Sequence, residues 1–279
     1  MYKIVLDSCG ELPEELKNDP HFSHVALTLD VDGVQITDDE TFDQARFLKL
    51  VKESKKGPKS ACPSPGAYMN ECECDAEHIY MITLSGELSG SYNSALCGKE
   101  MYEDEYDDGK KIHVFNSKSA SIGETLIALY VQGLEESGAS FEDVVQQTED
   151  YIESMNTFFV LETLDTFRKT GRLSGLKSFV ANTLNIKPVM ASTKSGYIYM
   201  LDQARGMKKA LVKMIDGMIA KTKDCENKVI AISHCNCPER AEFVKSLIEK
   251  VAHFKKIVIL DMSGVSTMYA NDGGIIIAV

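Results

Sequence analysis

Apolar positions in the first 155 residues fall into short runs that alternate with amphipathic segments. The runs cover residues 2–8, 78–84 and 111–115, and each ends in or is followed by small polar residues. Such runs are typical of buried parallel strands with functional groups at their carboxyl ends. Helical periodicity follows at residues 42–52, 92–102, 122–133 and 141–155. This alternation predicts a parallel α/β domain with helices on the faces of its sheet.

Two shorter segments of this half are also informative. Residues 25–29 predict a further strand, and residues 31–34 a turn with the Asp-Gly hairpin signal. Residues 55–65 are basic and rich in serine and proline, which predicts a loop.

The pattern changes near residue 156. Strands are predicted at residues 157–161, 185–190, 197–201, 229–233, 256–261 and 275–279, and helices at 206–222 and 238–251. A polar turn at residues 192–196 indicates a hairpin, so antiparallel pairing is expected. We therefore expect a two-domain α/β protein: a parallel α/β domain over residues 1–155 and an α+β domain over residues 156–279, with a ligand between them.

Composition narrows the class of protein. The 279 residues carry a net charge of −12, with 44% hydrophobic and 26% charged residues. These fractions are typical of a globular chain, and the acidic balance argues against nonspecific nucleic-acid binding. The sequence has neither an 18-residue apolar span nor a basic-then-apolar leader, so we expect a cytoplasmic protein without a transmembrane segment.

Eight cysteines include two C-x-C pairs, Cys72 with Cys74 and Cys235 with Cys237. With His234 beside the second pair, they would form a Cys/His zinc site if the two pairs met in space. The simpler interpretation is reduced thiols, as expected in a cytosolic protein.

A loop rich in serine and glycine spans residues 85–92, between a strand end and a helix start. Backbone amides lack partners there, so Ser89, Gly90 and Ser91 are suited to binding an anion. The spacing matches neither a P-loop nor a nucleophile elbow. The alternative is that these serines only cap the helix.

Other candidate groups lie in three further segments. Ser60 belongs to a proline-stiffened loop that could equally be an N-cap and turn. Arg172, Lys187 and Arg205 are cations beside glycine or proline in an acidic chain. They suit a carboxylate or phosphate, and the alternative is a solvated basic face or intramolecular salt bridges. The residues alone therefore indicate a small anion-headed ligand at a domain interface, with no demand for catalysis.

An ordered set of motifs resembles the DegV family of bacterial fatty-acid-binding proteins over the whole chain. The motifs are Ile4-Val5-Leu6-Asp7-Ser8, Pro63-Ser64, Leu88-Ser89-Gly90-Ser91-Tyr92, Asn116-Ser117, Leu161-Glu162-Thr163-Leu164, Gly171-Arg172-Leu173-Ser174, Asn185-Ile186-Lys187-Pro188, Arg205 and Ser233-His234.

The resemblance implies a carrier of one long-chain fatty acid rather than an enzyme, with no metal or cofactor. It implies that Ser60 and the Ser89-Gly90-Ser91 turn hold the carboxylate, and that Arg172 and Arg205 lie near the headgroup or face a partner. That partner is a separate ATP-dependent kinase, which makes the acyl-phosphate for phospholipid synthesis. The resemblance leaves open a transient contact with a membrane surface.

The sequence departs from the family pattern in three places. Residues 60–63 read Ser-Ala-Cys-Pro and keep one of two hydroxyls, and a Gly-Gly-Arg motif reads Thr170-Gly171-Arg172. A headgroup-side histidine aligns with Tyr269, which keeps a hydrogen-bond donor but does not titrate near neutrality.

Two alternatives stay open at this point. In the first alternative the chain is itself a small-molecule transferase or kinase. The sequence argues against this, because it has no phosphate-gripping Gly-Lys loop and no evident carboxylate set for Mg²⁺. In the second alternative the chain is a cysteine-rich metal or redox protein. For a carrier, the loops around Ser60 and residues 172–177 are candidate lids.

Overall fold

The computed structural model describes residues 1–173 and 185–279. Its amino-terminal part holds a parallel sheet in the order β2-β1-β6-β7, which confirms the expected parallel α/β arrangement. The strands are β1 (Tyr2–Asp7), β2 (Phe22–Val25), β6 (His78–Thr83) and β7 (Lys111–Asn116). A short 3₁₀ helix, η1 (Glu14–Leu16), follows β1.

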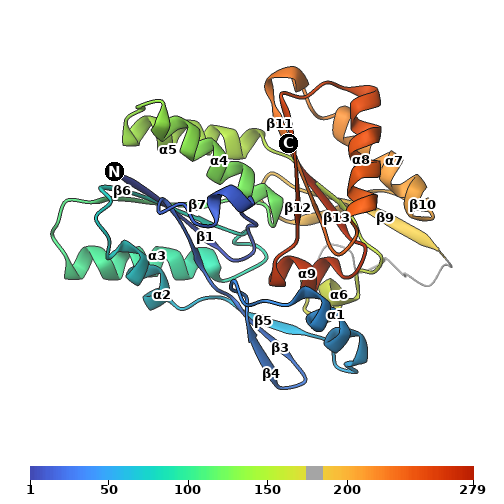
Figure 1. Ribbon diagram of the computed structural model, residues 1–279, viewed down its shortest axis with the longest axis horizontal. Helices are drawn as coiled ribbons and strands as arrows, with labels where there is room; N and C mark the ends of the chain where they lie inside the picture. Colours follow the sequence, from blue (N-terminus) through green and yellow to red (C-terminus); the bar gives the residue numbers. More distant parts are fainter. Residues whose placement is uncertain (174–184) are drawn as a thin grey trace.

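Helices cover both faces of this sheet (Figure 1). They are α2 (Pro65–Cys72) and α3 (Ser91–Glu105) on one face, and α4 (Ile122–Glu136) and α5 (Phe141–Ser154) on the other. The alternation of side chains along β1 explains this burial on two sides. Ile4 and Leu6 pack in the core with α4 and α5, and Val5 packs with α2 and α3.

A small antiparallel sheet in the order β4-β3-β5 was only partly predicted. Its strands are β3 (Thr28–Val31), β4 (Val34–Thr37) and β5 (Lys59–Ala61), and helix α1 (Gln44–Glu53) lies between the last two. The Asp-Gly hairpin is confirmed, because Val31 pairs with Val34. The strand expected at residues 25–29 is divided between β2 and β3. Ser60 lies on a strand and not in a loop, because it pairs with Leu29.

The carboxyl-terminal part forms a mixed sheet in the order β10-β9-β8-β13-β11-β12. Its strands are β8 (Thr157–Val160), β9 (Ile186–Ser192), β10 (Ile198–Arg205), β11 (Val229–His234), β12 (Lys256–Asp261) and β13 (Ile275–Ala278). Pairing is antiparallel except between β11 and β12, and the predicted hairpin is confirmed as β9 and β10.

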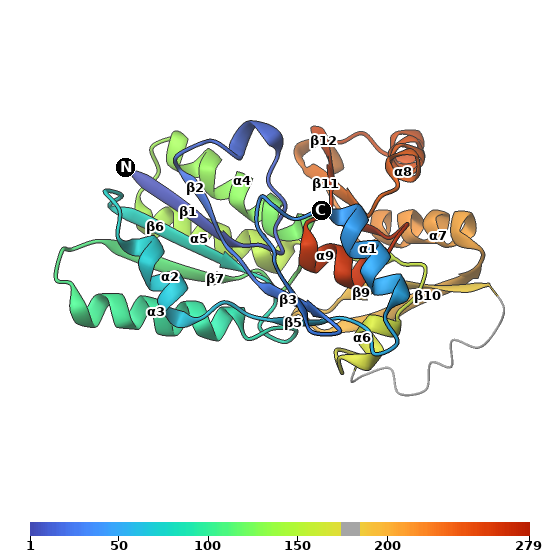
Figure 2. The same cartoon turned by 60° about the horizontal axis from the view of Figure 1, so that its bottom comes forward.

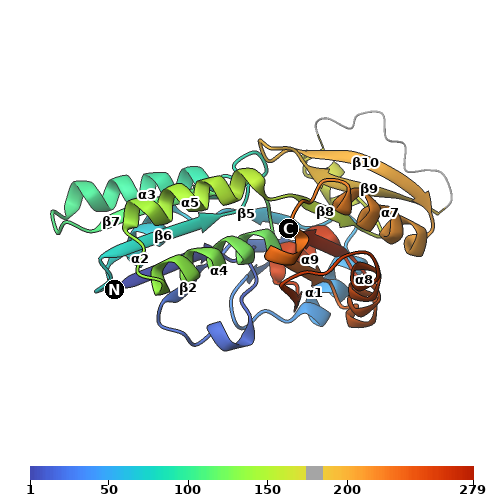
Figure 3. The same ribbon diagram turned by 90° about the horizontal axis from the view of Figure 1, so that it is seen from above.

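Helices also flank this second sheet (Figure 3). They are α6 (Asp165–Lys169), α7 (Met207–Ile219), α8 (Pro238–Val251) and α9 (Gly264–Ala270), with a 3₁₀ helix, η2 (Cys225–Asn227), before β11. Helices α7 and α8 pack over one large core cluster of the sheet. Helix α9 was not predicted, because its seven residues carry no clear apolar period.

Helix α9 joins the two parts of the chain (Figure 2). The carboxylate of Asp38, just after β4, accepts hydrogen bonds from the amides of Gly264 at 2.6 Å and Val265 at 2.8 Å. Helix α9 also contacts α1, and α4 contacts β11 and β13. The two sheets are therefore held side by side, and their junction forms the site described next.

None of the helices in residues 1–173 and 185–279 is both long and apolar enough to cross a membrane.

Candidate functional site

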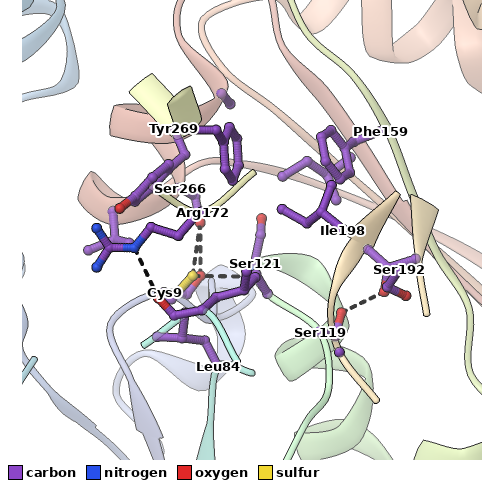
Figure 4. A pocket seen from close by; sticks show the side chains of 18 of the residues that line it. Cys9, Leu84, Ser119, Ser121, Phe159, Arg172, Ser192, Ile198, Ser266 and Tyr269 are labelled. Carbon is purple, nitrogen blue, oxygen red and sulfur yellow. Dashed lines mark hydrogen bonds between the residues drawn. The ribbon is translucent and has the colours of Figure 1, made fainter. Parts of the chain in front are cut away.

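A cavity lies at the junction of the two sheets (Figure 4). It is partly open to solvent, and its wall is mostly apolar, as in many small-molecule sites. Loops after β1, β6 and β7 contribute to its wall, together with β8, β10, β13 and α9. The lining residues are Cys9, Leu84, Leu88, Lys118, Ser119, Ala120, Ser121, Thr157, Phe159, Leu161, Phe167, Arg172, Ser192, Gly196, Ile198, Val265, Ser266, Tyr269, Ala270 and Ile276.

Apolar side chains make up much of this wall. Phe159 and Ile198 project from neighbouring parts of the second sheet, and Leu88 comes from the loop after β6. Such a lining favours an apolar ligand, because each buried CH₂ group contributes about 0.8 kcal/mol.

Arg172 and Tyr269 lie together on one side of the cavity (Figure 4). Arg172 Nε donates to the carbonyl oxygen of Leu88 at 3.1 Å, and its Nη1 donates to that of Thr170 at 3.1 Å. The guanidinium carbon lies 5.9 Å from the centre of the Tyr269 ring, which packs against Phe167 at 4.7 Å. These contacts fix a cation and a phenol at one edge of an apolar space.

Hydroxyl groups line the opposite side. Ser119 Oγ and Thr157 Oγ1 are hydrogen-bonded at 2.6 Å, and Ser192 lies nearby (Figure 4). The turn between β9 and β10 closes this side, because Ser85 Oγ donates to the carbonyl oxygen of Gly196 at 3.0 Å. Gly196 has a φ of +92°, and a Cβ there would lie 2.2 Å from Ser85 Oγ. Only glycine fits this contact.

Buried carboxyl groups lie behind the wall formed by Cys9, Ser121 and Ser266. Burial raises the pKa of Asp7 to about 6 and that of Glu11 to about 7. Glu11 accepts hydrogen bonds from Ser121 Oγ at 2.8 and 3.0 Å. Ser121 Oγ in turn lies 2.8 Å from Ser233 Oγ, so this network reaches the second sheet.

A third buried acid, Glu124, lies close to Asp7. Their carboxyl oxygens and the sulfur of Cys9 lie within 4.8 Å of one another, and no other such group of potential metal ligands occurs in residues 1–173 and 185–279. Burial raises the pKa of the Cys9 thiol well above its ordinary value. A thiol whose pKa is raised stays protonated near neutral pH.

The two C-x-C pairs do not form a joint site in the described part of the chain. Cys72 and Cys74 lie at and after the end of α2, beneath the first sheet, whereas Cys235 and Cys237 lie between β11 and α8. His234 pairs with Asp261 instead, at 3.2 Å. The spacing alone therefore gave no guide to their placement.

The predicted carboxylate-binding residues lie beside the cavity and not among its lining residues. Ser91 N–H donates to Ser89 Oγ at 3.2 Å, and the two hydroxyl oxygens are 3.1 Å apart. A Cβ on Gly90 would lie 3.0 Å from Cys62 Sγ, so this loop meets the segment that follows Ser60. The structure thus brings the two predicted loops together, and their binding of a carboxylate stays a prediction.

The remaining predicted residues divide between two places. Arg172 and Tyr269 line the cavity, whereas Arg205 lines a separate surface hollow with Lys208, Lys209 and Arg240. Lys187 pairs with Glu162, as the salt-bridge alternative anticipated. Of the predicted lid at residues 172–177, residues 174–177 lie outside the described residues.

Several lining residues were missed by sequence reasoning. Cys9 and Ser266 are 257 positions apart, yet Ser266 Oγ donates to the carbonyl oxygen of Cys9 at 2.9 Å. The one available signal was the run of small residues after the first strand, which marks a strand end near a ligand. No local pattern marked Ser266, because its helix was not predicted.

Known proteins resemble this chain over its whole length. Residues 1–279 match the family described as "Uncharacterised protein, DegV family". A DegV domain-containing protein of Streptococcus pneumoniae is 33% identical over 281 residues, covering 99% of this chain and 97% of that protein.

Solved structures show the same fold. A DegV family protein from Ruminococcus gnavus, refined with vaccenic acid, is 54% identical with a TM-score of 0.97 and covers 100% of this chain and 99% of its own. The Fatty Acid Kinase B3 protein of Streptococcus pneumoniae, loaded with linoleic acid, is 31% identical with a TM-score of 0.89 and coverages of 100% and 98%.

Proposed function

The chain belongs to the DegV family, and on this premise we propose that it binds one long-chain fatty acid in the cavity between its two sheets. The observation that carries the proposal is an apolar cavity between the two sheets with a guanidinium and a phenol at one edge. Relatives of the same fold hold vaccenic and linoleic acids. About fourteen buried methylenes would contribute on the order of 11 kcal/mol before ordering costs.

Hydrogen-bond donors for the carboxylate are available near Arg172. Within the described residues, two of its five N–H groups are used, by Leu88 and Thr170, which leaves three. Ser89 Oγ accepts from the Ser91 amide and lies 3.1 Å from Ser91 Oγ, and its hydroxyl would turn from Ser91 to donate to the ligand. Ser60, Gly90 and Ser91 complete this headgroup region, and Tyr269 supplies a phenol hydroxyl.

The two parts of the chain have different roles in this proposal. Residues 1–155 supply the headgroup-binding loops, and residues 156–279 close over the acyl chain. The carrier is not itself an enzyme: it acts in the cytoplasm and presents the carboxylate to an ATP-dependent kinase, which forms the acyl-phosphate. The likeness to the Fatty Acid Kinase B3 protein supports this step, and Arg205 in its basic hollow is the proposed contact for the partner.

A calorimetric titration of lipid-stripped protein tests the binding. Oleic acid should bind with a stoichiometry of one, and the alcohol of the same chain should bind at least tenfold more weakly because it lacks the carboxylate. Binding of neither compound, or equal binding of both, would contradict the proposed site. The kinase step is tested separately, by acyl-phosphate formation when kinase, ATP and the loaded protein are combined.

A further inference from the structure

Asp7 and Glu124 form a close pair of carboxyl groups in the interior. Asp7 ends β1, Glu124 lies in the first turn of α4, and neither side chain is exposed to solvent. Both oxygens of Asp7 accept amide hydrogen bonds, Oδ1 from Cys9 at 3.0 Å and Oδ2 from Leu84 at 2.9 Å. Asp7 is therefore equipped to carry a negative charge.

Glu124 has no such support. Neither Oε1 nor Oε2 has a partner among the N–H, O–H and ammonium groups of residues 1–173 and 185–279. An ionised carboxylate in that position would be a buried charge beside a second negative charge, with the weak S–H donor of Cys9 as its support. A protonated Glu124 would avoid this cost, because its O–H could donate to the Asp7 carboxylate, which lies within 4.8 Å.

The direction of the pKa values agrees with that geometry. Burial raises the pKa of Glu124 well above its ordinary value, and the hydrogen bond with Asp7 raises it further. The same hydrogen bond, with the amides of Leu84 and Cys9, acts to lower the pKa of Asp7. The positive end of α4 favours an ionised Glu124, but burial is the larger effect.

Among residues 1–173 and 185–279, the titratable groups that face the pair are acids. Cys9 and Glu11 follow β1, Asp38 follows β4, and Tyr68 comes from α2. Adding a charge to this group is therefore unfavourable, which also disfavours ionisation of Glu124.

Asp7 supports the start of the predicted headgroup loop. Its Oδ2 accepts from the amide of Leu84, where β6 ends, and the hydroxyl of Ser91 lowers its pKa from the start of α3. Ser91 is fully buried, and its amide donates to Ser89 Oγ. The loop that carries Ser89 therefore begins next to a residue, Leu84, whose amide is held by Asp7.

We propose that Asp7 and Glu124 share one proton, carried by Glu124, and that this pair is the positioning element for the loop at residues 85–91. The proton makes Glu124 equivalent to a glutamine at this position. Loss of the proton would repel the two carboxylates and displace the loop. The link to ligand affinity rests on the proposed function, whereas the shared proton does not.

Infrared spectroscopy tests the proton directly. Full-length protein with ¹³C-labelled glutamate carboxyls is dialysed against EDTA and measured at pH 8, in a Glu11→Gln background that removes the other raised glutamate. We expect a protonated carboxyl C=O band that disappears in the additional Glu124→Gln variant. Absence of the band, or its persistence in that variant, overturns the proposal, as does a metal ion that survives the dialysis.

Affinity measurements test the positioning role. With oleic acid as the probe, Glu124→Gln should bind within twofold of the parent between pH 6 and 9, and Glu124→Ala should bind at least tenfold more weakly at pH 7. Equal weakening by both variants would overturn the role, because only the glutamine can donate to Asp7. Circular dichroism confirms that both variants fold. If oleic acid does not bind the parent, the proposed function fails while the infrared band still decides the proton.

Discussion

Arg172 donates a hydrogen bond from Nε to the carbonyl oxygen of Leu88 at 3.1 Å, across the junction of the two sheets. Arg172 follows α6 in the second part of the chain, and Leu88 belongs to the loop after β6 in the first. Both residues line the cavity, so this contact has to open or shift when a ligand of acyl-chain size passes. The same side chain is the proposed partner of the carboxylate.

Replacing Arg172 by lysine should speed release of the fatty acid. Arg172→Lys keeps the charge, but an ammonium cannot contact Leu88, Thr170 and the Tyr269 ring with the geometry of a planar guanidinium. We expect the dissociation rate to rise roughly tenfold, which corresponds to about 1.4 kcal/mol. Stopped-flow exchange of a fluorescent fatty acid measures the rate. Arg168→Lys, at a side chain of α6 that is exposed to solvent, is the control and should leave it unchanged. Equal dissociation rates in both variants would mean that the contacts of Arg172 do not limit release of the fatty acid.

Ser89→Ala should weaken fatty-acid binding by about 0.5–1.5 kcal/mol, because it removes one hydroxyl donor to the carboxylate. The change is a loss of affinity of roughly twofold to tenfold in a calorimetric titration. Ser94→Ala is the matched control, since Ser94 lies on α3, which begins just after Ser89, and its hydroxyl contacts Cys62. An affinity unchanged by Ser89→Ala would mean that the Ser89 hydroxyl does not bind the carboxylate.

The free energy of unfolding should fall as the pH rises from 5 to 8. Burial raises the pKa of Glu11 to about 7 and those of Asp7 and Asp38 to about 6, so the native state binds more protons than the unfolded chain in this range. Stability supplied by a raised pKa is present at low pH and lost as the pH passes that value. Glu11 alone accounts for on the order of 2 kcal/mol.

Urea denaturation at a series of pH values measures this slope. Glu11→Gln should flatten it, because glutamine does not titrate. Glu142→Gln is the control, since the pKa of this exposed glutamate is lowered and it stays ionised throughout the range. A stability that rises between pH 5 and 8, or an unchanged slope in Glu11→Gln, would contradict the raised pKa values.

Gly196→Ala should undock the turn between β9 and β10. The new Cβ would meet Ser85 Oγ at 2.2 Å and would also force alanine to a φ of +92°. Gly138→Ala isolates the second effect, because Gly138 has a φ of +80° and open space around it. We expect Gly196→Ala to lower the free energy of unfolding by about 2 kcal/mol more than Gly138→Ala. Equal losses would mean that the turn does not hold the cavity closed.

Long elements with a clear period could be predicted from the sequence. Helix α8 covers residues 238–251 as expected, because Pro238 opens it and an apolar stripe continues to Val251. Helix α9 could not be predicted in this way, since its glycine, valine and threonine disfavour a helix. Its start is supported by Asp38, which lies 226 positions before Gly264 in the sequence. Strand β5 is likewise defined by pairing with β3 and not by its own three residues.

The candidate site shows the same limit. The residues alone indicated an anion, and the motif order indicated a fatty acid, but neither located the apolar wall. Phe159, Ile198 and Ile276 read as ordinary core residues of strands, and only the packing of one sheet against the other leaves space beside them. The sequence could not single out Glu124, because this residue matters only through its proximity to Asp7 in the fold.

Native mass spectrometry tests the central claim most directly, with lipid-stripped protein and one equivalent of oleic acid. The wild type and Ile198→Val should each carry one oleic acid. Ile198→Trp, which fills the cavity, should carry none while its circular dichroism spectrum matches that of the wild type. An unloaded wild type, an equally loaded Ile198→Trp, or bound zinc or nucleotide in place of the fatty acid would contradict a fatty-acid carrier with its ligand between the two sheets.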